Sequence, residues 1–306
     1  NSELSFNSED IIFFKVLTLF SFPPFVYVIR SRFVDSFLKT GELKIEGRSK
    51  KEIVFAAYLC HPLQSNDGIS GVACLLEIYD KLLKKDNYYT YRFFFIPETI
   101  GAIAWLSENE NKLNNIVGGL VATCIGDSGV IQYKRSRQIY SMIDNIVERV
   151  LKDTAAIEEY DIKDFEPLGS DERQFCSPGI NLPIGCLTRT PYGEFEEYHT
   201  SADNLDFVTE YNLQASFDIL KEIIYYLEYN KTYINVNPKC EPNLGRRGLY
   251  DLIGAGDRNK SIPLYKWILN YSDGKNSLID ISNKCDIKFE HILEAAKDLE
   301  MKDLIK

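Results

Sequence analysis

The sequence lacks an excess of positive charge. Its 306 residues include 35 lysines and arginines against 45 aspartates and glutamates, which gives a formal net charge of -10. Proteins that bind nucleic acid over a broad surface need an excess of Lys and Arg to displace counterions from phosphate. The composition therefore argues against such a surface. With 45% hydrophobic and 26% charged residues, it is typical of a globular protein.

The sequence also lacks a regular cysteine framework. Its seven cysteines are odd in number and scattered, and most lie in apolar runs, at positions 60, 74, 124, 176, 186, 240 and 285. This spacing favours free thiols in a reducing compartment over a set of disulfides. We therefore expect a cytoplasmic protein.

No apolar run is both long and uninterrupted enough to span a membrane. The most apolar stretch, residues 11–29, contains Lys15 and the pair Pro23–Pro24, which would break the helix of about 20 residues that a span requires. The stretch also lacks the basic start and small-residue cleavage site of a signal peptide. Short buried strands or a packed hairpin are the better interpretation, and no membrane partner is expected. The chain opens without methionine, as a fragment or a processed chain would.

Continuous apolar runs of strand length recur from residue 53 onward. They cover residues 53–59, 91–96, 118–125 and 182–187. Helical patterns alternate with them, at residues 71–85, 139–152 and 211–230. Strands that are apolar on both faces belong in a sheet covered by helices on both sides. The alternation predicts an α/β domain with a mostly parallel sheet.

The composition changes after residue 234. The next residues, 235–258, are rich in Asn, Pro, Gly and Arg, which is typical of a linker. Helices are then expected at 262–271, 277–284 and 287–302, the layout of a winged-helix module that stops before any wing. Residues 259–306 carry eight lysines and eight acidic residues. The last helix mixes acids with its lysines, so we expect it to pack against the preceding domain or a partner and to bind no specific nucleic acid.

Histidine is scarce, and two of the three histidines fall near the ends of predicted strands. His61 follows one strand directly, with Asp67 six residues on; Glu98 ends the next strand, Asp127 follows a third, and His199 follows a loop. Each has a plainer interpretation as a core, cap, turn or surface residue. Ligands of parallel sheets, however, bind outside the carboxyl ends of the strands. Imidazole and carboxylate suit a catalytic zinc, and a carboxylate outside the ligand set can act as general base.

Four ordered motifs carry a family resemblance. They are "CHP" followed by "ND" and "SG" within 60–71, "PETIG" at 97–101, "GSDERQF" at 169–175 and "YHTSADN" at 198–204. The series resembles the zinc aminopeptidases of the bacterial leucyl aminopeptidase and glutaminyl cyclase type. It is especially similar to a bacterial subgroup that has an inserted β-rich domain and a C-terminal winged helix.

The resemblance implies a domain organisation. Residues 1–50 would be a remnant of the inserted β-rich domain, and residues 51–234 the zinc aminopeptidase-like α/β domain. A linker at 235–258 would then lead to a winged-helix-like domain at 259–306.

The resemblance also implies roles for individual residues. His61 would be the first metal ligand, Asp67 a bridge between two metals, Glu98 the general base and His199 a late ligand. Residues 169–175 would line the pocket near the metals. The later aspartate ligand is assigned to Asp127.

Two positions depart from the family pattern. Thr99 stands where the family has a second glutamate ligand, and Thr123 falls at the position of the later aspartate, four residues before Asp127. We therefore expect one tightly bound zinc and an empty or weak second site. The ion would be held by His61, Asp67 and Asp127, or in another packing by His61, Asp67 and His199.

These features predict a zinc-dependent hydrolase, first of all an aminopeptidase acting on a peptide or another small amide substrate. Glu98 would take a proton from the attacking water. The alternatives are hydrolysis or transfer on a different amide, such as an N-acyl sugar or a terminal glutamine, and a non-catalytic binding module that keeps a metal. Arg135 and Arg137 would clamp an anionic substrate group or lie in a solvated loop. A homo-oligomer is left open.

Overall fold

The computed structural model describes residues 12–15, 26–29, 32, 34–61, 63–154, 159–249 and 261–306. The chain divides into two compact units, residues 1–38 and 39–306. In the first unit, strand β1 (Ile12–Lys15) pairs antiparallel with β2 (Val26–Ile29). Short paired strands were predicted here. The proline pair and nearly half of the predicted insert remnant lie outside the described residues, so the assignment of residues 1–50 stays a prediction.

A seven-stranded sheet forms the centre of the second unit, in the order β3-β5-β4-β6-β9-β7-β8. Its strands are β3 (Gly41–Ile45), β4 (Glu52–Tyr58), β5 (Thr90–Ile96), β6 (Ile116–Ala122), β7 (Ile131–Lys134), β8 (Tyr160–Lys163) and β9 (Ile184–Thr188). The four central strands β5, β4, β6 and β9 are mutually parallel. Strand β3 is antiparallel to β5, and β7 is antiparallel to β9. The predicted mostly parallel sheet is confirmed, and β3 belongs to it although it lies within residues 1–50.

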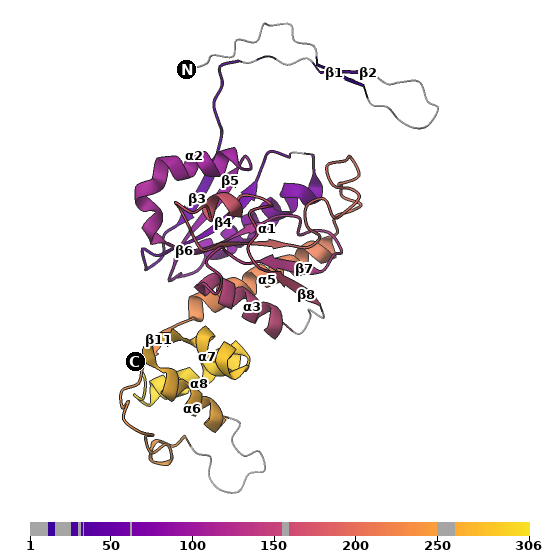
Figure 1. Cartoon of the computed structure of the whole chain (residues 1–306). Helices are drawn as coiled ribbons and strands as arrows, with labels where there is room; N and C mark the ends of the chain where they lie inside the picture. Colours follow the sequence, from indigo (N-terminus) through magenta and orange to yellow (C-terminus); the bar gives the residue numbers. More distant parts are fainter. Residues whose placement is uncertain are drawn as a thin grey trace. The chain divides into compact units, whose positions relative to one another are not determined.

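Helices cover both faces of the sheet (Figure 1). They are α1 (Ser70–Leu83), α2 (Ile100–Asn109), α3 (Met142–Asp153), α4 (Glu172–Phe175) and α5 (Glu210–Tyr229), with the 3-10 turn η2 (Glu110–Asn115) after α2. Successive strand residues point to opposite faces. Accordingly Phe55 of β4 packs in one core with α1, α3 and α5, while its neighbours Val54 and Ala56 pack with α2 and α4. The continuous apolar runs in the sequence reflect this double burial.

The C-terminal part is a winged-helix domain. It contains β10 (Thr232–Ile234), the turn η3 (Gly245–Arg247), α6 (Ser261–Tyr271), β11 (Asp273–Ser277), α7 (Leu278–Cys285) and α8 (Phe289–Met301). Strands β10 and β11 pair antiparallel, and the backbone of Ile234 exchanges hydrogen bonds with Lys306. The three predicted helices are confirmed. The segment predicted as a turn between the first two is instead strand β11.

The winged helix packs directly against the α/β domain. The backbone N–H of Phe289 donates to the Asp153 carboxylate at 2.9 Å, and its ring packs against Tyr226 with centroids 4.4 Å apart. Apolar side chains of α6, α7 and α8 belong to the same core cluster as those of α3 and α5. Packing on the preceding domain was predicted and is confirmed. None of the described helices is long and apolar enough to cross a membrane.

Candidate active site

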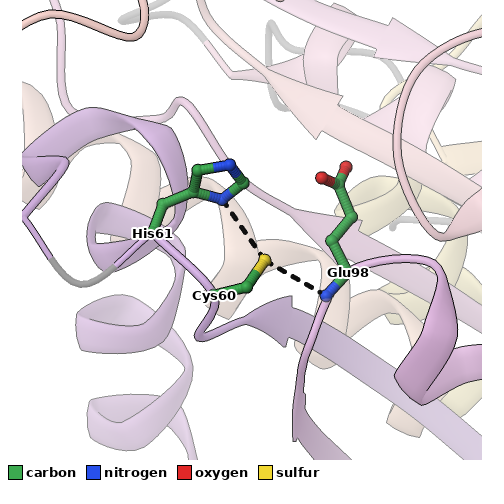
Figure 2. Close-up of side chains that lie close together, drawn as sticks. All are labelled: Cys60, His61 and Glu98. Carbon is green, nitrogen blue, oxygen red and sulfur yellow. Dashed lines mark hydrogen bonds between the residues drawn. The ribbon is translucent and has the colours of Figure 1, made fainter. Parts of the chain in front are cut away.

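The site begins at the carboxyl ends of the neighbouring parallel strands β4 and β5. Tyr58 and Ile96 are partners in this ladder, so the chain delivers His61 and Glu98 to the same edge. Between them lies Cys60, whose Sγ is 3.3 Å from His61 Nδ1 and accepts the backbone N–H of Glu98 at 3.3 Å. Figure 2 shows the imidazole and the carboxylate rising on either side of this sulfur. The sequence-based placement of His61 and Glu98 together is thus seen in the structure.

Asp67 and His199 complete this edge. Asp67 lies in the short π-helical turn η1 (Ser65–Ile69) and is only 1% exposed. The distance from its Oδ2 to His199 Nε2 is 3.0 Å. The rings of His61 and His199 are roughly parallel, with centroids 5.1 Å apart. One ligand atom from each of His61, Asp67 and His199 lies within 4.8 Å of the others. The structure therefore brings together three of the four predicted metal ligands.

The other oxygen of Asp67 is already engaged. The Tyr58 hydroxyl donates to Asp67 Oδ1 and accepts from Thr123 Oγ1 at 2.7 Å. Burial above all, and then the nearby Cys124 and Asp67, raises the pKa of Tyr58 well above its ordinary value. The phenol therefore acts as a donor to Asp67. Sequence reasoning missed Tyr58, which looked like one more apolar strand residue.

Asp203 fixes the turn that carries Asp67. Its Oδ1 accepts the backbone N–H of Asn66 at 2.6 Å, and its Oδ2 accepts that of Asp67 at 3.0 Å. Gly68 has a φ of 109°, and a Cβ there would lie 2.8 Å from the Tyr58 ring. The "SADN" sequence contained Asp203, but nothing in its spacing separated this role from that of an ordinary loop residue.

Asp127 does not join the metal-ligating group. It is 1% exposed, but its Oδ2 accepts from Asn66 Nδ2 at 2.8 Å, and its Oδ1 accepts from the Gly129 backbone and the Thr190 hydroxyl, both at 2.6 Å. It lies in neither of the metal-capable groups found among the described residues. The geometry therefore does not support the assignment of Asp127 as a ligand, because its oxygens already hold neighbouring loops together.

Residues 169–175 support the turn after Glu98. Thr99 has a φ of 65°, which a β-branched residue rarely adopts. The turn is held by Asp171 Oδ1, which accepts the Thr99 N–H at 2.6 Å, and by Arg173 Nη2, which donates to the Thr99 hydroxyl at 2.9 Å. Burial, with Glu98 and Glu172 nearby, raises the pKa of Asp171 to about 7. The side chain of Thr99 is thus engaged by Arg173.

The donor set fits a metal ion. Asp67 Oδ2 is buried and has no hydrogen-bond donor among the described residues, although His199 Nε2 is only 3.0 Å away. Two ligands of one tetrahedral zinc lie about 3.3 Å apart, given metal–ligand bonds of about 2.0–2.2 Å. A buried acceptor without a donor is costly. A cation shared with His61 and His199 would satisfy it.

The two arginines that the sequence suggested as substrate clamps are held by protein groups. Arg135 Nε donates to Glu148 at 2.5 Å and its Nη1 to Asp164 at 2.6 Å, while Arg137 Nη1 donates to Asn181 at 2.9 Å. The Arg135 guanidinium also lies 5.6 Å from the centre of the Tyr140 ring. These contacts favour the plainer interpretation as residues of a loop.

Fold and site together define an aminopeptidase-like α/β domain followed by a winged helix. Residues 25–230 match a family model described as a domain of unknown function (DUF4910), and residues 231–306 match a winged helix-turn-helix model. The chain belongs to the DUF4910 family.

A curated protein and a solved structure from Clostridium acetobutylicum are both closely similar to the chain. One has the provisional name of a polysaccharide biosynthesis protein with an aminopeptidase-like domain; it is 50% identical over 283 residues, 91% of this chain and 64% of that protein. The other is a crystal structure of a provisionally named peptidase, 49% identical with a TM-score of 0.79, covering 87% of this chain and 60% of that one. The chain thus spans less than two thirds of the length of these relatives.

More distant solved structures share the fold. A zinc aminopeptidase from Bacillus subtilis is 16% identical with a TM-score of 0.53, over 61% of this chain and 49% of that one. Glutaminyl cyclases are also among the structures of this fold. Because the identities are low, these matches establish the fold alone. The predicted resemblance to zinc aminopeptidases and glutaminyl cyclases is confirmed at that level.

Proposed function

We propose that the protein is a zinc-dependent amide hydrolase, in the first place an aminopeptidase. One ion would be held by His61, Asp67 and His199, and Glu98 would act as general base. The observation that carries the proposal is Asp67 Oδ2, a buried acceptor that lacks a hydrogen-bond donor in the described structure and lies 3.0 Å from His199 Nε2. Three N/O ligands with an open fourth position are typical of a catalytic zinc site.

The hydrogen bonds of Asp67 support a single ion. A bridging carboxylate needs both oxygens for metals, but Oδ1 of Asp67 accepts a hydrogen bond from Tyr58. The two family positions that would complete separate sites are Thr99 and Thr123, whose hydroxyls bond to Arg173 and Tyr58. Neither supplies a carboxylate. The set of groups suits one zinc and leaves a second site without ligands.

Glu98 is placed to move a proton. Its side chain is partly exposed, and none of the hydrogen bonds among the described residues ends on its carboxylate. Zinc in such a site supplies Lewis acidity, which makes hydroxide available near neutral pH. Glu98 would accept the proton of the attacking water and pass it to the leaving amine. The hydrogen bonds of Asp171 and Arg173 to Thr99 would hold the base in position during both transfers.

The substrate is proposed to be the N-terminal residue of a peptide. An amide on a sugar is the second candidate, because one relative is provisionally named a polysaccharide biosynthesis protein. Assays on aminoacyl amides and on N-acetylated sugars would separate the two.

The test of the proposed function is the variant Glu98→Gln, which keeps the shape of the side chain and removes the base. We expect it to bind zinc like the wild type and to lose amide hydrolysis by roughly 10²–10⁴-fold, the usual contribution of a general base. Glu108→Gln in α2 is the matched control and should keep full activity. Undiminished hydrolysis in Glu98→Gln would refute the mechanism. A wild type that binds zinc but hydrolyses neither class of amide would favour the metal-containing binding module.

The remaining partner and location assignments are proposals. The neutral charge of the winged helix and its packing on the α/β domain support the absence of specific DNA binding. Steeply salt-dependent binding to a duplex in gel-shift assays would contradict this. The described cysteines are all free thiols, which supports a cytoplasmic location. Sedimentation analysis would decide whether the chain forms a homo-oligomer.

A further inference from the structure

A second group of metal-binding side chains overlaps the first. Ligand atoms of Cys60, His61 and Glu98 also lie within 4.8 Å of one another. The Cys60 sulfur is 3.3 Å from His61 Nδ1, and Figure 2 shows the Glu98 carboxylate on the other side of that sulfur. Cys60 is exposed and the other two are partly exposed, so an ion can reach them from solvent.

The chemistry of this group differs from that of the group proposed to hold zinc. His61, Asp67 and His199 offer only nitrogen and oxygen, whereas Cys60 adds a soft sulfur ligand, which favours thiophilic cations. Sulfur and nitrogen ligands of one tetrahedral zinc lie about 3.6 Å apart, from bonds of about 2.3 and 2.0–2.1 Å; the observed separation is close to this. The backbone N–H of Glu98 already donates to the sulfur at 3.3 Å, as outer groups commonly do for a bound ligand.

The two groups share His61. A neutral imidazole has one nitrogen with a free lone pair, and the other carries a proton. Nδ1 faces Cys60, so an ion bound through it draws the shared imidazole into the second group. An ion at one site therefore competes with an ion at the other for His61.

We propose that Cys60, His61 and Glu98 form a second cation site, selective for thiophilic divalent cations such as cadmium, whose occupation competes with that of the ion held by Asp67 and His199. Binding converts the Cys60 thiol to a coordinated thiolate and releases its proton to solvent, with no change of oxidation state. It also takes up the carboxylate of Glu98, so a filled site would block the general base. This last consequence rests on the proposed function; the binding itself does not.

The test is a cadmium titration of the metal-free protein, followed by the ultraviolet absorption of cadmium–thiolate bonds. We expect one cadmium–sulfur bond per chain in the wild type and in Cys240→Ser, whose exposed thiol lies outside both groups. Cys60→Ser and Cys60→Ala should lose the absorption. Glu98→Gln should weaken binding by at least the roughly 10–100-fold that loss of an outer-shell partner costs a metal site.

Variants of the separate ligands distinguish this site from the proposed function. Asp67→Asn and His199→Ala should lose zinc but keep the cadmium–thiolate absorption, whereas His61→Ala should lose both. Added zinc should suppress the absorption at a lower zinc concentration in the wild type than in Asp67→Asn, because only the wild type also keeps the site of Asp67 and His199 that competes for His61. An absorption that persists in both Cys60 variants, or that is absent from the wild type, would overturn the second site. Failure of amide hydrolysis alone would leave it standing.

Discussion

Two aspartates at the same edge of the sheet have opposite surroundings. Asp67 and Asp127 are each 1% exposed, and both contribute to loops that meet at Asn66. Every oxygen of Asp127 accepts a hydrogen bond from a neighbouring loop. Asp67 has one oxygen bonded to Tyr58 and one without a donor among the described residues. Position and burial therefore do not distinguish the two aspartates. The free oxygen of Asp67 beside His199 does, and it is the reason why Asp67 is proposed as a ligand and Asp127 is not.

Exchanging the two aspartates for asparagine should give the largest contrast. Asp67→Asn replaces a proposed ligand, so zinc affinity should fall by more than the roughly 10–100-fold typical of outer-shell changes. Asp127→Asn should keep zinc binding. In this variant the new NH₂ group would face a donor, either Asn66 Nδ2 or the Gly129 N–H, in place of the oxygen that now accepts from it. The lost hydrogen bond should lower the free energy of unfolding by about 1–3 kcal/mol. Zinc titration and urea denaturation measure both quantities. Equal losses of zinc in the two variants would remove the distinction.

A third buried aspartate, Asp171, should make the stability depend on pH. Its pKa is raised from 3.8 to about 7, chiefly by burial, so folding favours the protonated carboxyl. The stability that it contributes is complete below its ordinary pKa and is lost as the pH rises through about 7. Asp171→Asn keeps the acceptor for Thr99 and cannot titrate. Between pH 4 and pH 7 the wild type should lose a few kcal/mol relative to this variant. Parallel stability curves over that range would contradict the raised pKa.

Tyr58→Phe tests the engaged oxygen of Asp67. The variant lacks the Tyr58 hydroxyl, which donates to Asp67 Oδ1 and accepts from the Thr123 hydroxyl. The metal-free protein should lose about 1–3 kcal/mol of unfolding free energy. Tyr88→Phe, at an exposed tyrosine, is the matched control and should change stability by less than about 0.5 kcal/mol. Thermal or urea denaturation measures both variants. An equal change in the free energy of unfolding for Tyr58→Phe and Tyr88→Phe would show that the hydrogen bond from Tyr58 to Asp67 does not stabilise the protein.

Arg135→Lys and Arg137→Lys should have the smallest effect on catalysis. Both guanidinium groups are bound to protein side chains, so neither is free to clamp a substrate anion. We expect the KM of each variant to stay within about twofold of the wild type. Lysine cannot reproduce the planar fork of arginine. A large rise in KM in either variant would therefore restore the substrate-clamp hypothesis.

The parts of the fold that could be predicted are those buried on both sides. Strands β4, β5, β6 and β9 are continuous apolar runs, and their ends located His61 and Glu98. In the central sheet the strands missed were β3, β7 and β8. They are short and partly exposed, and along β3 and β7 buried or partly buried residues alternate with more exposed ones. At sequence level they look like loops, because an outer strand needs apolar residues on fewer positions.

The sequence predicted which types of side chain lie at the candidate site, but not which of them hydrogen-bond to one another. His61, Asp67 and His199 were found because the residue types and motif order were distinctive. The choice between Asp127 and His199 as third ligand depended on whether the Asp127 carboxylate already had hydrogen-bond donors. Those donors come from residues up to 63 positions away, such as Thr190. The spacing of residues along the chain does not predict such long-range contacts. The sequence therefore left both ligand sets open, the one with Asp127 and the one with His199.

The central claim is that one ion is held by His61, Asp67 and His199. Its most direct test is the zinc content per chain, measured by elemental analysis after dialysis, in the wild type, His199→Ala and Asp127→Asn. We expect one zinc in the wild type and in Asp127→Asn, and none in His199→Ala. Two zincs per wild-type chain, or zinc retained in His199→Ala and lost in Asp127→Asn, would contradict it.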